Sequence, residues 1–135
     1  MSPILRNLLS VLAGIALGMV LNMGLLYLGS AIVPTPAGVD VMNTESIKAN
    51  MHLFEPRHFL FPFLAHAGGT LGGAWLAARL SANQGMRWAL VVGVIFLAFG
   101  VINVYSLPAP AWFNATDLIL AYIPMGWLGG KLAKQ

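Results

Sequence analysis

The sequence predicts an all-α membrane protein, with four transmembrane helices in an up-and-down bundle and both termini in the cytoplasm. Of its 135 residues, 59% are hydrophobic and 8% are charged, whereas soluble domains carry about 25% charged residues. Four apolar stretches are long enough to cross the roughly 30 Å hydrocarbon core, which takes about 20 helical residues. These stretches are residues 4–33, 58–80, 87–107 and 112–130, and an outer loop at 34–57 joins the first two.

The composition also limits the kinds of function that the chain can have. It contains no cysteine, which excludes disulfides, thiolate metal sites and cysteine redox chemistry. The net charge is +3, but the basic residues are scattered along the chain rather than clustered, so no nucleic-acid partner is expected. The length allows a single domain spanning residues 1–135.

The direction of the spans follows from the positions of the charges. Five basic residues fall at one end of the spans, namely Arg6, Arg79, Arg87, Lys131 and Lys134. Only Lys48 and Arg57 fall at the other end, together with all four acidic residues. Because short positively charged segments stay cytoplasmic, we expect both termini inside a bacterial inner membrane and the loop at 34–57 outside it.

The first span, residues 4–33, has Arg6 before its apolar run, as a secretory signal peptide does. The run is much longer than the roughly 7–15 apolar residues of a signal sequence, and no clear small-residue cleavage site follows it. We therefore expect a retained transmembrane helix.

The outer loop, residues 34–57, contains a pattern typical of a short amphipathic helix. Asn43 is placed to cap it, and Glu45 in its first turn complements the helix dipole. Its apolar face consists of Ile47, Met51 and Phe54. We expect this helix to lie on the outer membrane surface; the alternative is that it covers a cavity between the spans.

The predicted spans are rich in glycine, and the second and fourth each contain a proline. Pro62 and Pro124 each remove a backbone donor and should kink the second and fourth helices. Small residues four apart let helix backbones approach closely in membranes. The glycines with this spacing are Gly14, Gly18, Gly68, Gly69, Gly72, Gly73, Gly126 and Gly130. We expect them to pack the four helices on each other, and a dedicated dimer face is the alternative.

Polar side chains inside the spans are the best indicators of function, because each is costly in hydrocarbon. They gather in the outer half and predict an outward-facing polar pocket formed by His66, Asp117, Asn22 and Asn103. Three further polar residues, Glu55, Arg57 and His58, should lie at the outer interface, where Glu55 and Arg57 can form an ion pair.

His66 and Asp117 each allow two interpretations. His66 can hold the bundle together through a hydrogen bond to Asn22, Asn103 or Asp117, or it can accept a proton, bind a metal ion or ligate haem. No second ligand lies at helical spacing from it, so no metal site is predicted. Asp117 can be a favourable acid in the first turn of a helix capped by Asn114 or Thr116. Alternatively, it can pair with His66.

The stretches HLFEPRHFLFPFLAHAGGTLGGA (52–74) and LPAPAWFNATDLILAYIPMGWLGGKLA (107–133) resemble a family of small, uncharacterised bacterial membrane proteins with four spans. The segment GVDVMNTESIKANM (38–51) extends the resemblance over most of the chain. The resemblance implies a four-helix membrane fold and a bacterial inner membrane. It implies no activity and no catalytic residues.

These observations predict a non-enzymatic membrane subunit, acting in assembly, as an accessory or by self-association. Its partners would be membrane lipid and either further copies of itself or a larger membrane complex, and no cofactor is predicted. The first alternative is a small transporter or channel for protons, cations or small solutes that uses His66 and Asp117. The second is a membrane-embedded enzyme or a haem or metal binder at the outer face, which would use Glu55 and the three histidines, His52, His58 and His66. His66 is the position at which haem or a metal ion could bind.

Overall fold

A computed structural model describes residues 1–134, and within this range every regular element is helical. The prediction of an all-helical protein is therefore confirmed. The α-helices are α1 (Pro3–Ile32), α2 (Thr44–Asn50), α3 (Leu60–Leu80), α4 (Gly85–Ser106), α5 (Ala111–Leu120) and α6 (Ile123–Ala133). Two short 3₁₀ turns, Met51–Leu53 and Pro56–Phe59, lie between α2 and α3.

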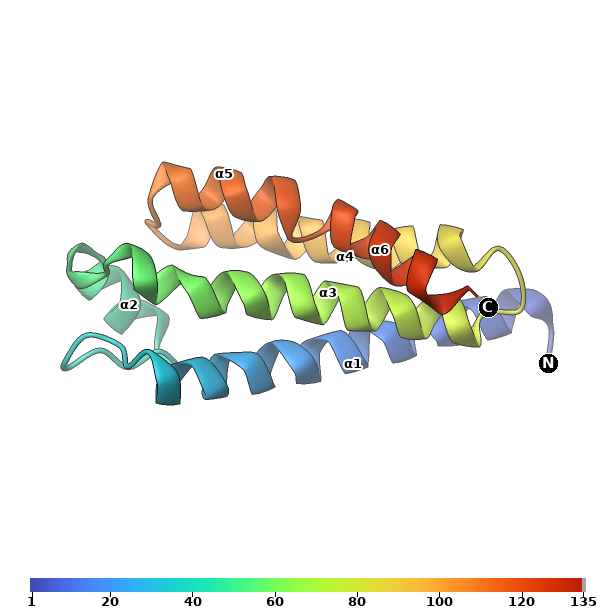
Figure 1. Ribbon diagram of the computed structural model, residues 1–135, viewed down its shortest axis with the longest axis horizontal. Helices are drawn as coiled ribbons and strands as arrows, with labels where there is room; N and C mark the ends of the chain where they lie inside the picture. Colours follow the sequence, from blue (N-terminus) through green and yellow to red (C-terminus); the bar gives the residue numbers. More distant parts are fainter. Residues whose placement is uncertain (135) are drawn as a thin grey trace.

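The long helices α1, α3 and α4 and the consecutive pair α5–α6 lie side by side along one direction (Figure 1). Both termini and the turn between α3 and α4 lie at one end, which we call the terminal end. Helix α2 and the connection between α4 and α5 lie at the opposite end, which we call the loop end (Figure 1). Helix α3 occupies the centre, because it packs on α1, α4 and α6, whereas α1 touches α4 only sparsely.

Helices α1 and α4 are long and apolar enough to cross a membrane, with mean hydropathies of 2.1 and 2.2. Only 22% of the residues in the most apolar window of each helix are buried. Large apolar side chains such as Leu12, Val20, Val94 and Ile102 are exposed on them. Exposed apolar side chains on both helices are compatible with crossing a membrane.

Glycines bring α1 and α3 into backbone contact along a line formed by Gly14, Gly18, Gly69 and Gly73. A Cβ atom added at Gly69 would lie 2.7 Å from the carbonyl oxygen of Gly18, and one added at Gly18 would lie 2.8 Å from that of Gly69. Backbone atoms cannot move aside as a flexible side chain can. The close approach of these two helices therefore requires glycine at these positions.

The remaining predicted packing glycines also lie at contacts between helices of the same chain. Gly126 of α6 meets Gly93 of α4, and Gly130 meets Met86 and Ala89. Gly68 and Gly72 of α3 contact the side chains of Leu25 and Leu21 of α1, respectively. Internal packing thus accounts for all eight glycines, with no need for a dimer face.

The two prolines act differently from each other. Pro124 lies in the first turn of α6, and the helical conformation is interrupted just before it, between Leu120 and Ile123. The expected interruption near Pro124 is therefore present. Pro62, in contrast, occupies the first turn of α3, where its missing N–H has no intrahelical acceptor to lose. The expected kink at Pro62 is wrong, because the helix begins only two residues before it.

The terminal end is closed by polar contacts and an apolar core. The side chain of the buried Asn7 donates to Asn83 Oδ1 at 3.2 Å and accepts from the backbone N–H of Ala82 at 2.7 Å. Arg6 Nε donates to the carbonyl oxygen of Leu80 at 2.8 Å. Beyond them lies a core of small and β-branched side chains: Val11, Ala74, Ala77, Ala89 and Val92. This half of the molecule is therefore tightly packed.

Candidate functional site

Three side chains, from α3, from α5 and from the break between α5 and α6, form a hydrogen-bonded cluster in the half of the molecule nearer the loop end. His66 of α3 and Asp117 of α5 are joined by a 2.8 Å contact between Nδ1 and Oδ1. The hydroxyl of Tyr122, between α5 and α6, donates to Oδ2 of the same carboxyl group at 2.9 Å. The Asp117 side chain is only 6% exposed. Both of its oxygens are therefore satisfied inside the protein, as a buried carboxyl group requires.

This arrangement decides between the two interpretations of Asp117. Helix α5 begins at Ala111 after Pro110, with no side-chain cap, so Asp117 lies in its second turn. Asn114 Nδ2 instead approaches the carbonyl oxygen of Ala109 at 3.4 Å, and Thr116 donates to Trp112 O at 2.8 Å. The capping interpretation is wrong because the helix starts earlier than expected, and the pairing with His66 is what the structure contains.

Tyr122 belongs to the cluster but was not expected there. In a continuous helix, residues five apart point about 140° away from each other, so Asp117 and Tyr122 would not share a face. The break before Pro124 removes this restriction and lets Tyr122 turn back to the carboxyl group. Gly100 of α4 makes room for the phenol, since a Cβ there would lie 2.6 Å from the Tyr122 hydroxyl. Pro124 and Gly100 were the features of the sequence that could have indicated this position of Tyr122.

The cluster fixes the orientation of the His66 ring and leaves one of its nitrogens free. The tyrosine ring stacks beside the imidazole, with 5.9 Å between centroids and 27° between planes. The Nδ1 nitrogen of the imidazole is engaged by the Asp117 carboxyl group. In the part of the chain that the structure describes, Nε2 has no hydrogen-bond partner. It is therefore the group of the cluster that can interact with a ligand.

Two adjoining cavities meet at His66. The deep cavity, of about 160 Å³, lies between α1, α3 and α4 and reaches Thr70 and Tyr122. The outer cavity, of about 550 Å³, extends from His66 and Asp117 to the loop end. Both share Asn22, His66, Gly100 and Asn103 in their walls. All four residues predicted for the polar pocket thus line the outer cavity, and three of them also line the deep one.

The two asparagines that line both cavities, Asn22 and Asn103, differ from the hydrogen-bonded cluster because their side-chain amides have no partner in the described part of the chain. Neither the Asn22 side chain nor the Asn103 side chain makes a hydrogen bond to any residue within 1–134. Each amide offers two donors and one acceptor. Asn22 is half-buried and Asn103 is exposed, so water or a ligand can satisfy both side chains.

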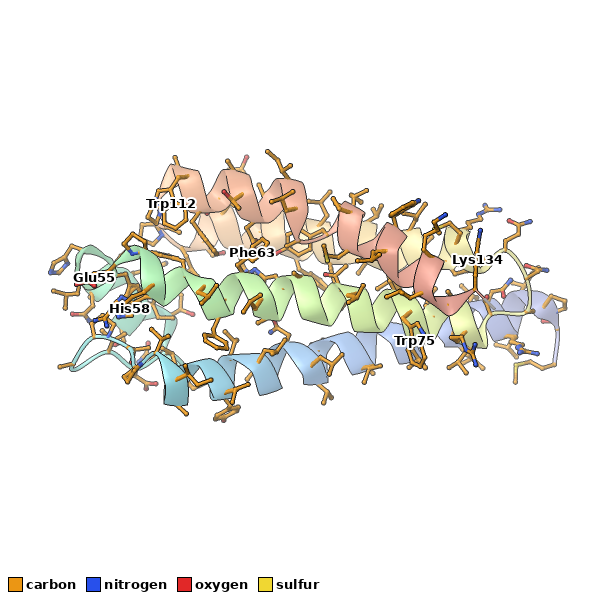
Figure 2. All side chains as sticks on the ribbon, viewed as in Figure 1. Glu55, His58, Phe63, Trp75, Trp112 and Lys134 are labelled. Atoms are coloured by element: carbon orange, nitrogen blue, oxygen red, sulfur yellow. The ribbon has the colours of Figure 1, made fainter. Side chains whose placement is uncertain are left out.

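The interfacial residues lie at the mouth of the outer cavity. Glu55 and Arg57 form the expected ion pair, with 3.1 Å between Oε2 and Nε, and both side chains are largely exposed. His58 Nδ1 accepts from the backbone N–H of Glu55 at 2.8 Å. Figure 2 shows Glu55 and His58 together at the loop end, at the beginning of α3. His58 Nδ1 is thus engaged in the 3₁₀ turn before α3. His58 is separated from His66 by about two turns along the helix.

The segment from Asn43 to Phe54 lies against the outer cavity. Asn43 caps α2 as expected, accepting from the N–H groups of Glu45 and Ser46. Ile47 of α2, Met51 of the following 3₁₀ turn and Phe54 line the outer cavity. This arrangement matches the alternative, in which the segment covers a cavity, while its placement on a membrane surface stays a prediction.

The described residues contain no group of three or more His, Asp or Glu side chains arranged to hold a metal ion. His66 and Asp117 both line the outer cavity, and they bind each other. His58 also lines this cavity, but its Nδ1 accepts from the backbone N–H of Glu55.

The chain matches no protein-family model, no curated protein and no solved structure. The site must therefore be interpreted from its own geometry.

Proposed function

We propose that this chain is a small multi-pass protein of a bacterial inner membrane, with four spans and cytoplasmic termini, that binds a ligand without catalysing a reaction. Its role would be that of an accessory subunit with an outward-facing pocket. One observation carries the proposal: the polar side chains that line cavities gather toward the loop end, while the terminal half is packed around an apolar core.

The distribution of apolar and aromatic side chains supports a membrane location. Exposed leucine, valine and isoleucine side chains cover the flanks of the long helices. Trp112 lies at the loop end, and Trp75 lies toward the terminal end with Lys134 (Figure 2). Tryptophan at both boundaries and lysine at one match the aromatic belts and the positive-inside rule. The pair α5–α6 spans residues 111–133, which at 1.5 Å per residue is about 35 Å, enough for one crossing.

Binding fits the geometry better than transport does. A transporter or channel needs a polar path to both sides of the membrane. The cavities stop at Thr70, whose hydroxyl is occupied by the carbonyl oxygen of His66 at 2.8 Å. Past this point the core consists of residues such as Ala74, Ala77 and Val92, which are fully buried. A pocket that opens at one end only is suited to holding a ligand.

The topology is testable because the chain has no cysteine of its own. Two matched variants, Ala49→Cys in α2 and Ala82→Cys in the turn between α3 and α4, each replace an exposed alanine at opposite ends. In intact cells, a membrane-impermeant thiol reagent should label Ala49→Cys and leave Ala82→Cys unlabelled. Opening the cells should expose Ala82→Cys.

The opposite pattern would reverse the orientation, and labelling of both variants in intact cells would exclude the proposed topology. A soluble fraction containing the untagged protein after cell lysis would contradict a membrane location altogether. The cysteine-free parent chain serves as the control for background labelling.

A further inference from the structure

The deep cavity has the size of a single aromatic ring. A protein cavity of roughly 150 Å³ accepts benzene, and the deep cavity measures about 160 Å³. Its walls include Phe96 and Phe99, whose ring centroids lie 6.1 Å apart, as well as the Tyr122 ring. Aromatic walls of this kind favour a flat ring held by offset or edge contacts.

The polar groups around this space match oxygen atoms on such a ring. Asn22, Asn103 and His66 line both cavities, and the two amides and His66 Nε2 have no hydrogen-bond partner within residues 1–134. Together they offer donors and acceptors, so they can bind either a hydroxyl or a carbonyl oxygen. The charged groups that line the outer cavity already have partners: Asp117 binds His66 and Tyr122, and Arg57 binds Glu55. A neutral ligand is therefore favoured over an ion.

The surroundings of the cavities indicate how such a ligand would enter. Helices α1 and α4 make few contacts with each other, and Met19 and Phe99, which line the deep cavity from these two helices, are 55% and 47% exposed. The deep cavity is therefore bordered by exposed side chains of α1 and α4, which would face lipid if the helices cross a membrane. The outer cavity, at about 550 Å³, is lined mainly by apolar side chains and lies within the usual range for small-molecule sites. It can hold an apolar tail.

We infer that the joined cavities bind a neutral, membrane-soluble amphiphile whose head is a six-membered ring with hydroxyl or carbonyl oxygens, the chemistry of prenylated quinones and phenols. The ring would occupy the deep cavity beside Asn22, Asn103 and His66, and the apolar tail the outer cavity. This inference rests on the proposed function, because it names the ligand class of the same pocket.

The test uses the purified full-length chain in lipid nanodiscs, with decyl-benzoquinone as the probe and decanol as its ring-free counterpart. Binding is measured by equilibrium dialysis against empty nanodiscs, which corrects for partition into lipid. The test variant combines Asn22→Leu and Asn103→Leu, which removes both amides without breaking any described hydrogen bond. The control variant, Thr116→Val, removes an exposed hydroxyl outside both cavities.

We expect saturable binding of decyl-benzoquinone by the parent chain and by Thr116→Val, with much weaker binding of decanol. The double variant should bind roughly thirtyfold more weakly, since it loses two hydrogen bonds. Equal binding of decanol would overturn the assignment of a ring, and undiminished binding by the folded double variant would overturn the role of the amides. Absence of any quinone binding would overturn the inference. The cysteine labelling would still decide the membrane topology separately.

Discussion

Replacing Asp117 with leucine is expected to lower the free energy of unfolding by about 3 kcal/mol, because it removes the common partner of two largely enclosed polar groups. The imidazole of His66 and the hydroxyl of Tyr122 would each lose the acceptor that they now have at 2.8 and 2.9 Å. Leucine has a similar shape, so the loss would arise from hydrogen bonding and not from a void. The measurement is thermal or denaturant unfolding of the purified protein in detergent.

Two further variants separate the parts of this effect. Tyr122→Phe removes one donor only and should cost about 1 kcal/mol. Thr116→Val, one residue from Asp117 on the exposed side of α5, should leave stability nearly unchanged. If Asp117→Leu unfolded at the same denaturant concentration as the parent chain, the cluster would not stabilise the fold and the account of the site would be wrong.

The second large effect is expected for Gly14→Ala in the contact line between α1 and α3. A Cβ at this position would collide with the carbonyl oxygen of Gly73 and lie 3.0 Å from the Cβ of Ala77. Both obstacles are rigid, so the helices must separate. We expect a loss of about 2 kcal/mol, as for other overpacked sites.

Gly24→Ala is the matched control on the same helix. Nothing lies within 4 Å of a Cβ added at Gly24, and alanine favours the helix by about 1 kcal/mol over glycine. The two substitutions should therefore shift unfolding in opposite directions. Equal shifts would mean that glycine matters in α1 only through helix propensity. The close contact with α3 would then make no contribution to the free energy of unfolding.

The sequence was informative wherever one physical effect dominated. Long apolar runs located the long helices within a few residues, because helix length and hydropathy are properties of a single segment. Close helix contact was predicted at Gly14, Gly18, Gly69 and Gly73, since only glycine permits it. The cap at Asn43 followed from local side-chain chemistry in the same way.

The expectations failed where neighbouring effects competed. The start of α5 was misplaced because Pro110, in an extended conformation, begins the helix without the side-chain cap that Asn114 or Thr116 was expected to supply. An amphipathic pattern does not say what covers its apolar face, so the sequence could not show that Ile47, Met51 and Phe54 line the outer cavity. Tyr122 was missed because the break at Pro124 changes which side chains share a face.

The central claim is that a pocket facing outward reaches Asn22, deep in α1, from the loop end. Asn22 lies ten residues before the end of the helix, about 15 Å along its axis. Val20 lies at nearly the same depth, but it is exposed on the flank and lines neither cavity. In reconstituted vesicles, a charged thiol reagent added to the outer side should label Asn22→Cys and spare Val20→Cys. Equal labelling of both variants, or labelling of Asn22→Cys from the inner side only, would contradict the account.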